Sequence, residues 1–156
     1  DCRFEPSCSS NDLVMMTSTD GSRWSSMRRI PLAPVGAGFD YAVPGLGIDQ
    51  NTAGSTAHLG LAFYYYPANC FNDCNLSVGF ASSLDGGASW RPTMRLAGPF
   101  PADWTAAGNN SVGDYITVSF SGGKALPIFA VPAVPGSSYL NEAMYTMAGG
   151  LPVGTS

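Results

Sequence analysis

Short apolar segments separated by polar turn residues run along most of the chain. Seven of them are rich in aromatic and aliphatic side chains and are bounded by clusters of Gly, Pro, Asn, Asp or Ser, which is the pattern of strands that end in turns. No window of 11 or more residues has a helical period. The sequence therefore predicts an all-β fold. The predicted strands cover residues 12–19, 41–49, 58–66, 76–83, 115–121, 125–132 and 140–147.

The predicted strands recur in the same order along the chain. An Asp-Tyr pair opens a strand at 40–41 and again at 114–115, and a Gly-containing hairpin then leads to an apolar strand that ends in Pro. A third strand follows in both cases. The segments 12–19 and 25–34, near the start of the chain, fit the third and fourth positions of the same unit. The chain is thus an array of repeated antiparallel units.

Four-stranded antiparallel units in series are typical of β-propeller blades. We expect about two and a half to three blades: the end of a blade at 1–35, a full blade at 36–98, a third blade at 99–150 and a tail at 151–156. A closed propeller has about 4–8 blades. We therefore expect the remainder of a propeller to come from a longer polypeptide, from a second chain or from copies of this chain.

Two turns carry the same set of residues. In such a turn a carboxylate can accept hydrogen bonds from backbone N–H groups, a glycine can adopt a positive φ and a tryptophan can bury a large apolar face. The second turn matches S-x-D-x-G-x-[ST]-W, and the first repeats it with one residue fewer. The residues are Ser83, Asp85, Gly87, Ser89 and Trp90 in the second turn, and Ser18, Asp20, Gly21 and Trp24 in the first.

These turns resemble the Asp-box, or BNR repeat, of the sialidase-like β-propeller superfamily. As a repeat frame, the resemblance covers nearly the whole chain. It implies that the boxes are structural and lie on the outer rim, away from any active site. It also implies a glycan-binding or glycoside-hydrolase-like role. A retaining sialidase of this kind would use three arginines, a Tyr nucleophile polarised by a Glu, and an Asp acid/base.

The arginines of this chain do not supply the triad that the resemblance would require. The segment 29–31, Arg-Ile-Pro, is similar to the family's R-I-P motif, but it follows an Asp-box on an outer strand. The arginines at 23, 28, 91 and 95 lie within or beside the boxes. Whether the chain is an enzyme is therefore open. The alternatives are a non-catalytic structural or adhesive extracellular protein, and a hydrolase that uses two carboxylates, Asp40 and Asp114.

Ligands of propellers usually bind where the innermost strands meet. The Asp-Tyr pairs open equivalent innermost strands and are our candidates for lining that channel, although Asp can equally cap a turn and Tyr can pack between blades. His58 and Lys124 open equivalent second strands, and Glu142 could polarise Tyr115. The candidate catalytic residues are Asp40, Asp114 and Tyr115, and the candidate ligand-binding residues are Tyr41, His58, Lys124 and Glu142.

Three consecutive tyrosines, Tyr64, Tyr65 and Tyr66, could form a platform for a sugar ring. Alternation along a strand places the first and third on one face and the second on the other. Packing between sheets explains them equally well and requires no ligand.

Composition and charge restrict the partners. Seven Lys and Arg against 11 Asp and Glu give a net charge of −4, and no basic stripe is present, so nucleic acid is not expected as a partner. No apolar segment approaches the roughly 20 residues of a membrane span.

The four cysteines form two close pairs, for which we expect the disulfides Cys2–Cys8 and Cys70–Cys74. Disulfides indicate an oxidising compartment and hence secretion. Zinc is the alternative, but the single histidine lies elsewhere and there is no C-x2-C pair. We therefore expect neither a metal nor another cofactor.

Overall fold

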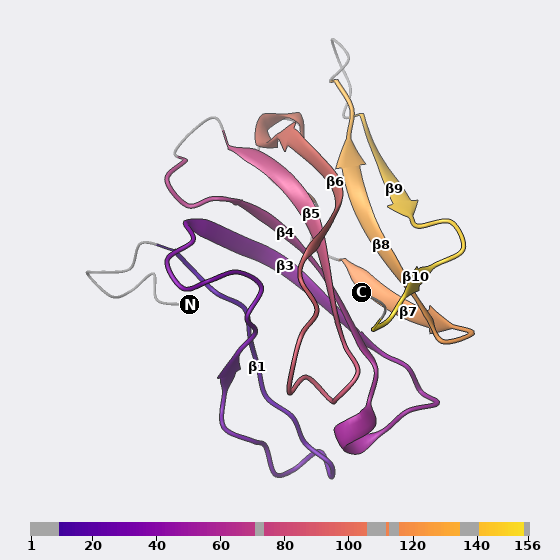
Figure 1. Ribbon diagram of the computed structural model, residues 1–156. Helices are drawn as coiled ribbons and strands as arrows, with labels where there is room; N and C mark the ends of the chain where they lie inside the picture. Colours follow the sequence, from indigo (N-terminus) through magenta and orange to yellow (C-terminus); the bar gives the residue numbers. More distant parts are fainter. Residues whose placement is uncertain (1–9, 71–73, 106–111, 113–115, 135–140, 155–156) are drawn as a thin grey trace.

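The computed structural model describes residues 10–70, 74–105, 112, 116–134 and 141–154 (Figure 1). The regular elements within these residues are β-strands and two short 3-10 turns, so the predicted all-β fold is confirmed. The strands are β1 (Val14–Met15), β2 (Arg28–Arg29), β3 (Phe39–Ile48), β4 (Leu59–Pro67), β5 (Asn75–Ser83), β6 (Met94–Pro101), β7 (Thr117–Ser121), β8 (Lys124–Pro132), β9 (Glu142–Thr146) and β10 (Leu151–Pro152); the turns are η1 (Gly54–Thr56) and η2 (Ala102–Trp104).

The central sheet is a four-stranded antiparallel meander in the order β3-β4-β5-β6. Its register joins Ile48 to Leu59 and Leu59 to Ser83, so one end of the sheet holds the β3–β4 and β5–β6 turns. Strand β4 is buried from Leu59 to Tyr64, and β5 is buried along all of its length after Asn75. Burial of consecutive residues means that both faces of this sheet are covered, since successive side chains point to opposite faces.

The second large sheet has β8 at its centre. Strand β7 lies on one side of β8, while β9 and β10 both pair with its other side. Strand β9 pairs with residues 128–132 and β10 with Ala125 and Lys124, so the turn between them returns the chain to the same edge. Leu151 and Pro152, which we placed in a tail, therefore extend this sheet. A short hairpin of β1 and β2 forms the remaining sheet.

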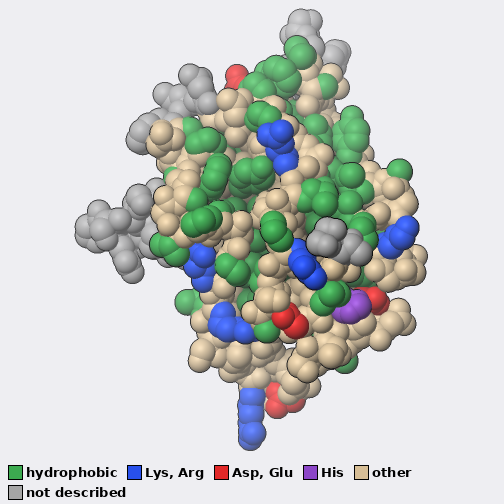
Figure 2. Space-filling view, in the orientation of Figure 1, with side chains coloured by type: hydrophobic (Ala, Val, Ile, Leu, Met, Phe, Trp, Pro, Cys, Tyr) green, Lys and Arg blue, Asp and Glu red, His purple; other side chains and the backbone are tan. Residues whose placement is uncertain are grey.

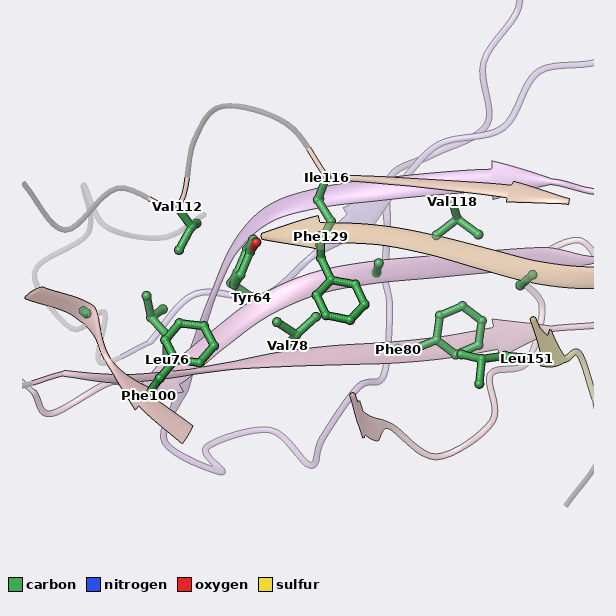
Figure 3. Close-up of a cluster of buried hydrophobic side chains, with 13 residues drawn as sticks. Tyr64, Leu76, Val78, Phe80, Phe100, Val112, Ile116, Val118, Phe129 and Leu151 are labelled. Atoms are coloured by element: carbon green, nitrogen blue, oxygen red, sulfur yellow. The ribbon is translucent and has the colours of Figure 1, made fainter. Parts of the chain in front are cut away.

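Two hydrophobic clusters cover the two faces of the central sheet. The first lies between the central sheet and the β7–β10 sheet, and Figure 3 shows its aromatic rings pointing into the space between them. The second lies between the opposite face and the N-terminal segment. The three sheets thus pack in a series. The first cluster includes Ala62, Tyr64, Leu76, Val78, Phe80, Phe100, Val118, Ala125 and Phe129, and the second includes Met15, Ile30, Leu32, Tyr41, Leu59, Leu61, Phe63 and Ala81.

Strands β3 and β7 approach each other closely, backbone to backbone. A Cβ added to Gly45 would clash with the carbonyl oxygen of Ile116, and one added to Gly47 would clash with that of Val118. The absence of a side chain at two alternate positions of β3 is what permits this contact. The first strands of two successive units therefore meet directly.

Tyr64 links the two large sheets. Its hydroxyl donates to the carbonyl oxygen of Ala130 (2.9 Å) and accepts from the N–H of the same residue (2.9 Å). Burial raises the pKa of Tyr64 to about 12. Tyr66 packs against the same cluster and Tyr65 against the other one. This agrees with the alternation expected for the three tyrosines and with a packing role for Tyr64.

Candidate functional site

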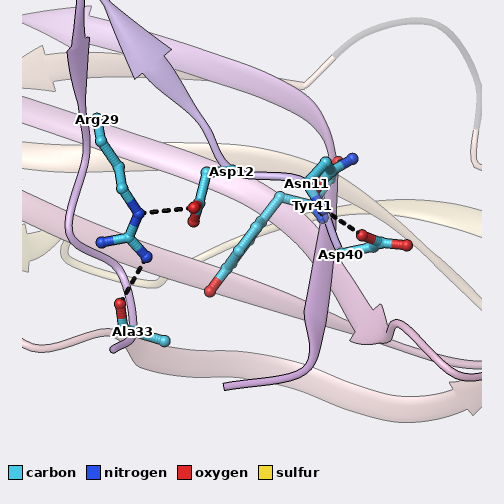
Figure 4. Close-up of polar contacts among 6 residues, drawn as sticks. All are labelled: Asn11, Asp12, Arg29, Ala33, Asp40 and Tyr41. Atoms are coloured by element: carbon cyan, nitrogen blue, oxygen red, sulfur yellow. Dashed lines mark hydrogen bonds and ion pairs between the residues drawn. The ribbon is translucent and has the colours of Figure 1, made fainter. Parts of the chain in front are cut away.

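The start of β3 is tied to the N-terminal segment through Asn11. The backbone N–H of Asn11 donates to Oδ1 of Asp40 (2.6 Å), and the N–H of Tyr41 donates to Oδ1 of Asn11 (2.6 Å). The side-chain amide of Asn11 also donates to the carbonyl oxygen of Tyr41 (3.0 Å). Figure 4 shows these residues gathered at one point of β3. The Asp40 carboxylate thus holds a loop in place.

An ion pair lies next to this contact. Nε of Arg29 is 2.6 Å from Oδ2 of Asp12, and the same guanidinium donates to the carbonyl oxygen of Ala33 (2.7 Å) (Figure 4). The hydrogen bond with Asp12 raises the pKa of the Arg29 guanidinium. Arg29 therefore supports the loop that leads to β3, and its position on the strand after an Asp-box is as expected.

The backbone of β3 is irregular beside these groups. The register with β4 shifts between Ala42 and Gly45, and Val43 has φ of 47°. A positive φ in a β-branched residue is strained and is often found at functional sites. A surface hollow lies at this point, lined by Asn11, Asp12, Leu13, Tyr41, Ala42, Val43, Pro44 and Tyr66.

The hollow combines groups that suit a polar ligand of modest size. Asn11 lines it with an amide that is bonded to the Tyr41 backbone, Asp12 with a carboxylate whose Oδ2 is paired with Arg29, and Tyr66 with an aromatic ring. Sugars are bound by this combination, because hydroxyl groups need hydrogen-bond partners and the faces of the ring are apolar. The Tyr41 ring, in contrast, is buried and lies edge-on to Phe63 with the ring centroids 5.6 Å apart. Its burial raises the pKa of Tyr41.

The candidate residues fall at two opposite ends of the sheets. Asp40 pairs with Tyr66, near the end of β4, and Glu142 pairs with Pro132, at the end of β8. His58 and Lys124 lie at the other ends of these strands, beside the β3–β4 and β7–β8 turns. The structure thus places Glu142 at the same end as Asp40 and Tyr41, and separates His58 and Lys124 from them. Asp114 and Tyr115 lie outside the described residues.

The Asp85 turn has the hydrogen bonds that its residues predict. Oγ of Ser83 donates to Oδ1 of Asp85 (2.7 Å) and accepts from the N–H of Gly87 (2.9 Å). The Ser89 hydroxyl donates to Oδ2 of Asp85 (2.6 Å), and the Ser89 N–H donates to Oδ1 (2.8 Å). The Ser89 hydroxyl is the main reason that the pKa of Asp85 is lowered to about 2. Gly87 has φ of 83° and contacts Met15 of the preceding unit.

The Asp20 turn repeats this arrangement. Oδ1 of Asp20 accepts from the N–H groups of Arg23 (2.8 Å) and Ser22 (2.9 Å), and Ser18 accepts from the N–H of Gly21 (2.9 Å). The hydrogen bond from Arg23 is the largest cause that lowers the pKa of Asp20 to about 2. Both carboxylates are therefore occupied within their own turns. Both turns lie at the end of the sheets opposite to the hollow.

The structure also contains one of the two predicted disulfides. Cys70 and Cys74 are bonded, which confirms that pair, and their Cα atoms are 5.2 Å apart. Cys2 and Cys8 lie outside the described residues. No group of three or more His, Cys, Asp and Glu side chains within the described part of the chain is placed to hold a metal. None of the helices described is long and apolar enough to cross a membrane.

Reasoning from the sequence missed the role of Asn11 and Asp12 and the strained backbone at Val43. The ion pair had a usable signal, since the Asp20 turn fixes a hairpin whose register sets Val14 opposite Arg29. A Pro-Gly dipeptide within a predicted strand, at 44–45, was the signal for the irregular register. Nothing in the local sequence linked Asn11 to β3.

Comparison of the chain with family models, with curated proteins and with solved structures found no match. The architecture therefore rests on the sheets themselves: an all-β protein with antiparallel sheets, one of which has four consecutive strands.

Proposed function

We propose that this chain is part of a secreted β-propeller of the sialidase-like type, and that the hollow at the start of β3 recognises a carbohydrate. The observation that carries the proposal is the hollow itself, where an amide, a carboxylate and an aromatic ring converge beside the strained backbone of Val43. The hollow lies at the start of a strand that would be innermost in a propeller.

The packing of the sheets supports the propeller part of the proposal. Blades of a propeller stack face to face around a central channel, and the central sheet is covered on both faces by its neighbours in the chain. The innermost strands of adjacent blades must converge near the channel. The backbone contact of Gly45 and Gly47 with β7 has this geometry.

The distribution of the Asp-box residues supports the choice of site. Asp20 and Asp85 are engaged within their own turns, at the opposite end of the sheets from Asp40. Asp20 and Asp85 therefore do not take part in binding at the hollow. The disulfide Cys70–Cys74 follows β4 at the same end as the hollow and favours an oxidising compartment.

Recognition fits the geometry better than hydrolysis does. The Asp40 carboxylate already accepts a hydrogen bond from Asn11, and the Tyr41 ring is buried. Arg29 is paired with Asp12 and with a backbone carbonyl. Asp40 and Arg29 thus already hold loops of this chain in place, and the buried Tyr41 ring packs in the core, as suits the wall of a binding site.

The test is a titration of the chain with a panel of monosaccharides and sialosides, followed by NMR chemical shifts. We expect shifts of residues around the hollow, and a loss of affinity of about tenfold or more when Tyr66→Ala removes the aromatic ring, since stacking and burial of such a ring are worth about 1.4 kcal/mol or more. Asp103→Asn, an exposed change on η2, is the control and should bind as the unaltered chain does. Binding that Tyr66→Ala leaves unchanged would contradict the site.

A second candidate function is a structural or adhesive role without a small ligand. The engagement of Asp40 by the backbone of Asn11 favours it, because this contact fastens one unit to the next. If no sugar in the panel shifts any resonance near the hollow, the structural role replaces the recognition role. If instead the chain hydrolyses a sialoside and Asp40→Asn abolishes the activity, the hypothesis of a hydrolase that uses the Asp40 carboxylate is correct.

A further inference from the structure

The charges around the hollow at the start of β3 are unevenly balanced. The lining of the hollow includes one carboxylate, Asp12, and among the described residues it includes no lysine or arginine. A second carboxylate, Asp40, adjoins the hollow, since it accepts a hydrogen bond from the backbone of Asn11. The wall that a ligand would contact therefore carries negative charge.

One cation, Arg29, lies beside the hollow and already has partners within the chain. Its Nε is 2.6 Å from Oδ2 of Asp12, and its Nη2 donates to the carbonyl oxygen of Ala33 (2.7 Å). Figure 4 shows the Asp12 carboxylate between this guanidinium and Asn11. The charge of Arg29 is thus used to hold two segments of the chain together, and Asp12 stands between it and the hollow.

The electrostatics at Tyr41 show which of the two charges has the larger effect on the wall of the hollow. Burial is the main reason that the pKa of Tyr41 is raised, the charge of Asp12 raises this pKa further, and the charge of Arg29 lowers it by less. A neighbouring charge that raises the pKa of a phenol disfavours an anion at that place. Tyr41 lines the hollow, so a negative group is disfavoured there.

The remaining walls suit an uncharged sugar. Ala42, Val43 and Pro44 provide apolar surface, and Tyr66 provides an aromatic ring. The Asp12 carboxylate can accept hydrogen bonds from sugar hydroxyls, and hydrogen bonds to a charged acceptor are stronger than those between neutral groups. An acidic sugar would instead bring a second carboxylate toward that of Asp12, where like charges repel.

We propose that the hollow selects neutral sugars over acidic ones, and that Asp12 determines this specificity. The inference rests on the proposed function, carbohydrate recognition at the hollow, and names its ligand class: hexoses that carry hydroxyl groups and no carboxylate. Sialic acids and uronic acids fall outside this class, because the guanidinium that could pair with their carboxylate is held by Asp12 and by the carbonyl of Ala33.

The test compares sugars that differ in one group. The methyl glycosides of galactose and galacturonic acid form one pair, and those of glucose and glucuronic acid form another; within each pair a hydroxymethyl group is replaced by a carboxylate. Each sugar is titrated at pH 7 and low ionic strength, and NMR chemical shifts around the hollow give the affinity. We expect the neutral member to bind about tenfold more tightly or better, because juxtaposed like charges are costly in a binding site.

Two variants test whether Asp12 is the cause. Asp12→Asn removes the charge, keeps the shape of the side chain and leaves Arg29 available to the acidic sugar, so the preference for the neutral member should fall by about tenfold. Adding Arg29→Gln to this variant should reverse the gain in affinity for the acidic sugar. Asp103→Asn, the same change of charge at an exposed position of η2, is the matched control and should keep the preference of the unaltered chain.

A measurement on the unaltered chain makes the test independent of how well the variants fold. Dissolved salt screens the repulsion between charges near the surface. Raising sodium chloride to about 0.5 M should therefore bring the affinities of the two members of each pair closer together, mainly by improving that of the acidic member. A preference that does not change with salt, or that Asp12→Asn leaves intact in a folded chain, would overturn the role of Asp12.

The outcomes also separate this inference from the proposed function. An acidic sugar that binds at the hollow as tightly as its neutral counterpart would overturn the selectivity and keep carbohydrate recognition. If no member of either pair shifts a resonance near the hollow, the selectivity is overturned together with the recognition of hexoses.

Discussion

Ser89 sets the ionisation of the Asp85 carboxylate. Its hydroxyl and its backbone N–H both donate to the carboxylate of Asp85, and hydrogen bonds to the charged form favour ionisation. Asp20 is held in the same way by the N–H groups of its own turn. Both carboxylates are the hydrogen-bond acceptors of their own turns, which agrees with the structural role expected for the two boxes.

The first prediction concerns the acid stability of the chain. The pKa of Asp85 falls from 3.8 to about 2 on folding. The stabilisation by this carboxylate is therefore fully present above about pH 4 and is lost as the pH falls toward 2. We expect Ser89→Ala, which removes the largest cause of the lowered pKa, to lower the thermal midpoint at pH 5 and to reduce the further loss between pH 4 and 2.

The measurement is the thermal midpoint, followed by circular dichroism, at half-unit steps from pH 5 to pH 2. Ser119→Ala, an exposed serine on β7, serves as the control and should follow the unaltered chain at every pH. An unchanged pH profile for Ser89→Ala would show that its hydroxyl does not set the ionisation of Asp85.

Residues close in sequence were predictable, and residues brought together by the fold were not. The Ser83–Asp85–Ser89 contacts follow from the spacing of the motif alone, because all the partners lie within one turn. The contact of Asn11 with Asp40 joins positions 29 residues apart. The positive φ of Val43 comes from the shift in pairing between β3 and β4, which no local preference of valine would suggest.

At the scale of elements, glycine decides how closely β3 and β7 can lie. Gly45 and Gly47 point toward the backbone of β7, while Leu46 between them points away and is half-exposed. The alternation of glycine and leucine along β3 gives the strand one face that contacts β7 and an opposite face that is exposed to solvent. It also explains why a strand in the interior of the chain carries two glycines.

The second prediction tests this contact. Gly47→Ala should lower the free energy of unfolding by about 3 kcal/mol, because the new methyl group meets the carbonyl of Val118 and must displace backbone. Leu46→Ala, at the neighbouring position, should lower the free energy of unfolding by less than about 1 kcal/mol, because the Leu46 side chain is half-exposed and little of it is buried on folding. Urea unfolding of the two variants beside the unaltered chain gives both values.

If Gly47→Ala unfolds at the same urea concentration as the unaltered chain, β3 and β7 are further apart than the structure places them. The contact between β3 and β7 would then no longer support the proposed propeller.

The strands themselves were largely predictable from pattern. The observed β4 and β5 begin and end within one residue of the segments predicted at 58–66 and 76–83, because runs of buried residues bounded by turns leave little choice. The segments predicted at 12–19 and 25–34 form only two pairs of residues, at β1 and β2. Pairing continues only where cross-strand contacts support it, and among the described residues nothing covers Val14, Met16, Trp24 and Met27 on the outer face of this hairpin.

At the scale of the molecule, Tyr64 couples the two large sheets. Its hydroxyl satisfies both the N–H and the carbonyl of Ala130. Leaving two buried backbone groups without partners is more costly than losing one ordinary hydrogen bond. One side chain thus fixes the distance between β4 and β8.

The third prediction follows from this contact. Tyr64→Phe should lower the free energy of unfolding by about 1–3 kcal/mol, the cost of buried polar groups without partners. Tyr65→Phe, which alters the next residue on the opposite face, is the comparison and should cost less. Urea unfolding near pH 7 measures the difference.

Tyr64 also makes the stability of the fold depend on pH in the alkaline range. The pKa of Tyr64 rises from 10.0 to about 12 on folding, so the unfolded chain loses this proton first. The stabilisation is fully present below pH 10 and is lost as the pH rises from 10 to 12. Tyr64→Phe should show a smaller loss over this range; an equal loss would assign the alkaline transition to other groups.

The arrangement of units was predictable only as far as the repeat itself. The order of strands and the Asp-boxes indicated stacked antiparallel units, and three sheets do pack in series. Figure 2 shows hydrophobic side chains over much of one face of the molecule, with charged side chains scattered among them. Which of them a neighbour covers depends on contacts across sheets, such as Trp90 against the N-terminal segment, and those follow from the three-dimensional arrangement.

The two Asp-box turns and the hollow at the start of β3 lie at opposite ends of the same strands. Changes at one end therefore reach the other only through the length of the sheet. Cys70 and Cys74 lie at the hollow end, between β4 and β5, and are joined by a disulfide. Changes in the length of the connection between β4 and β5 should leave the two Asp-box turns unaltered, because those turns lie at the other end of the strands.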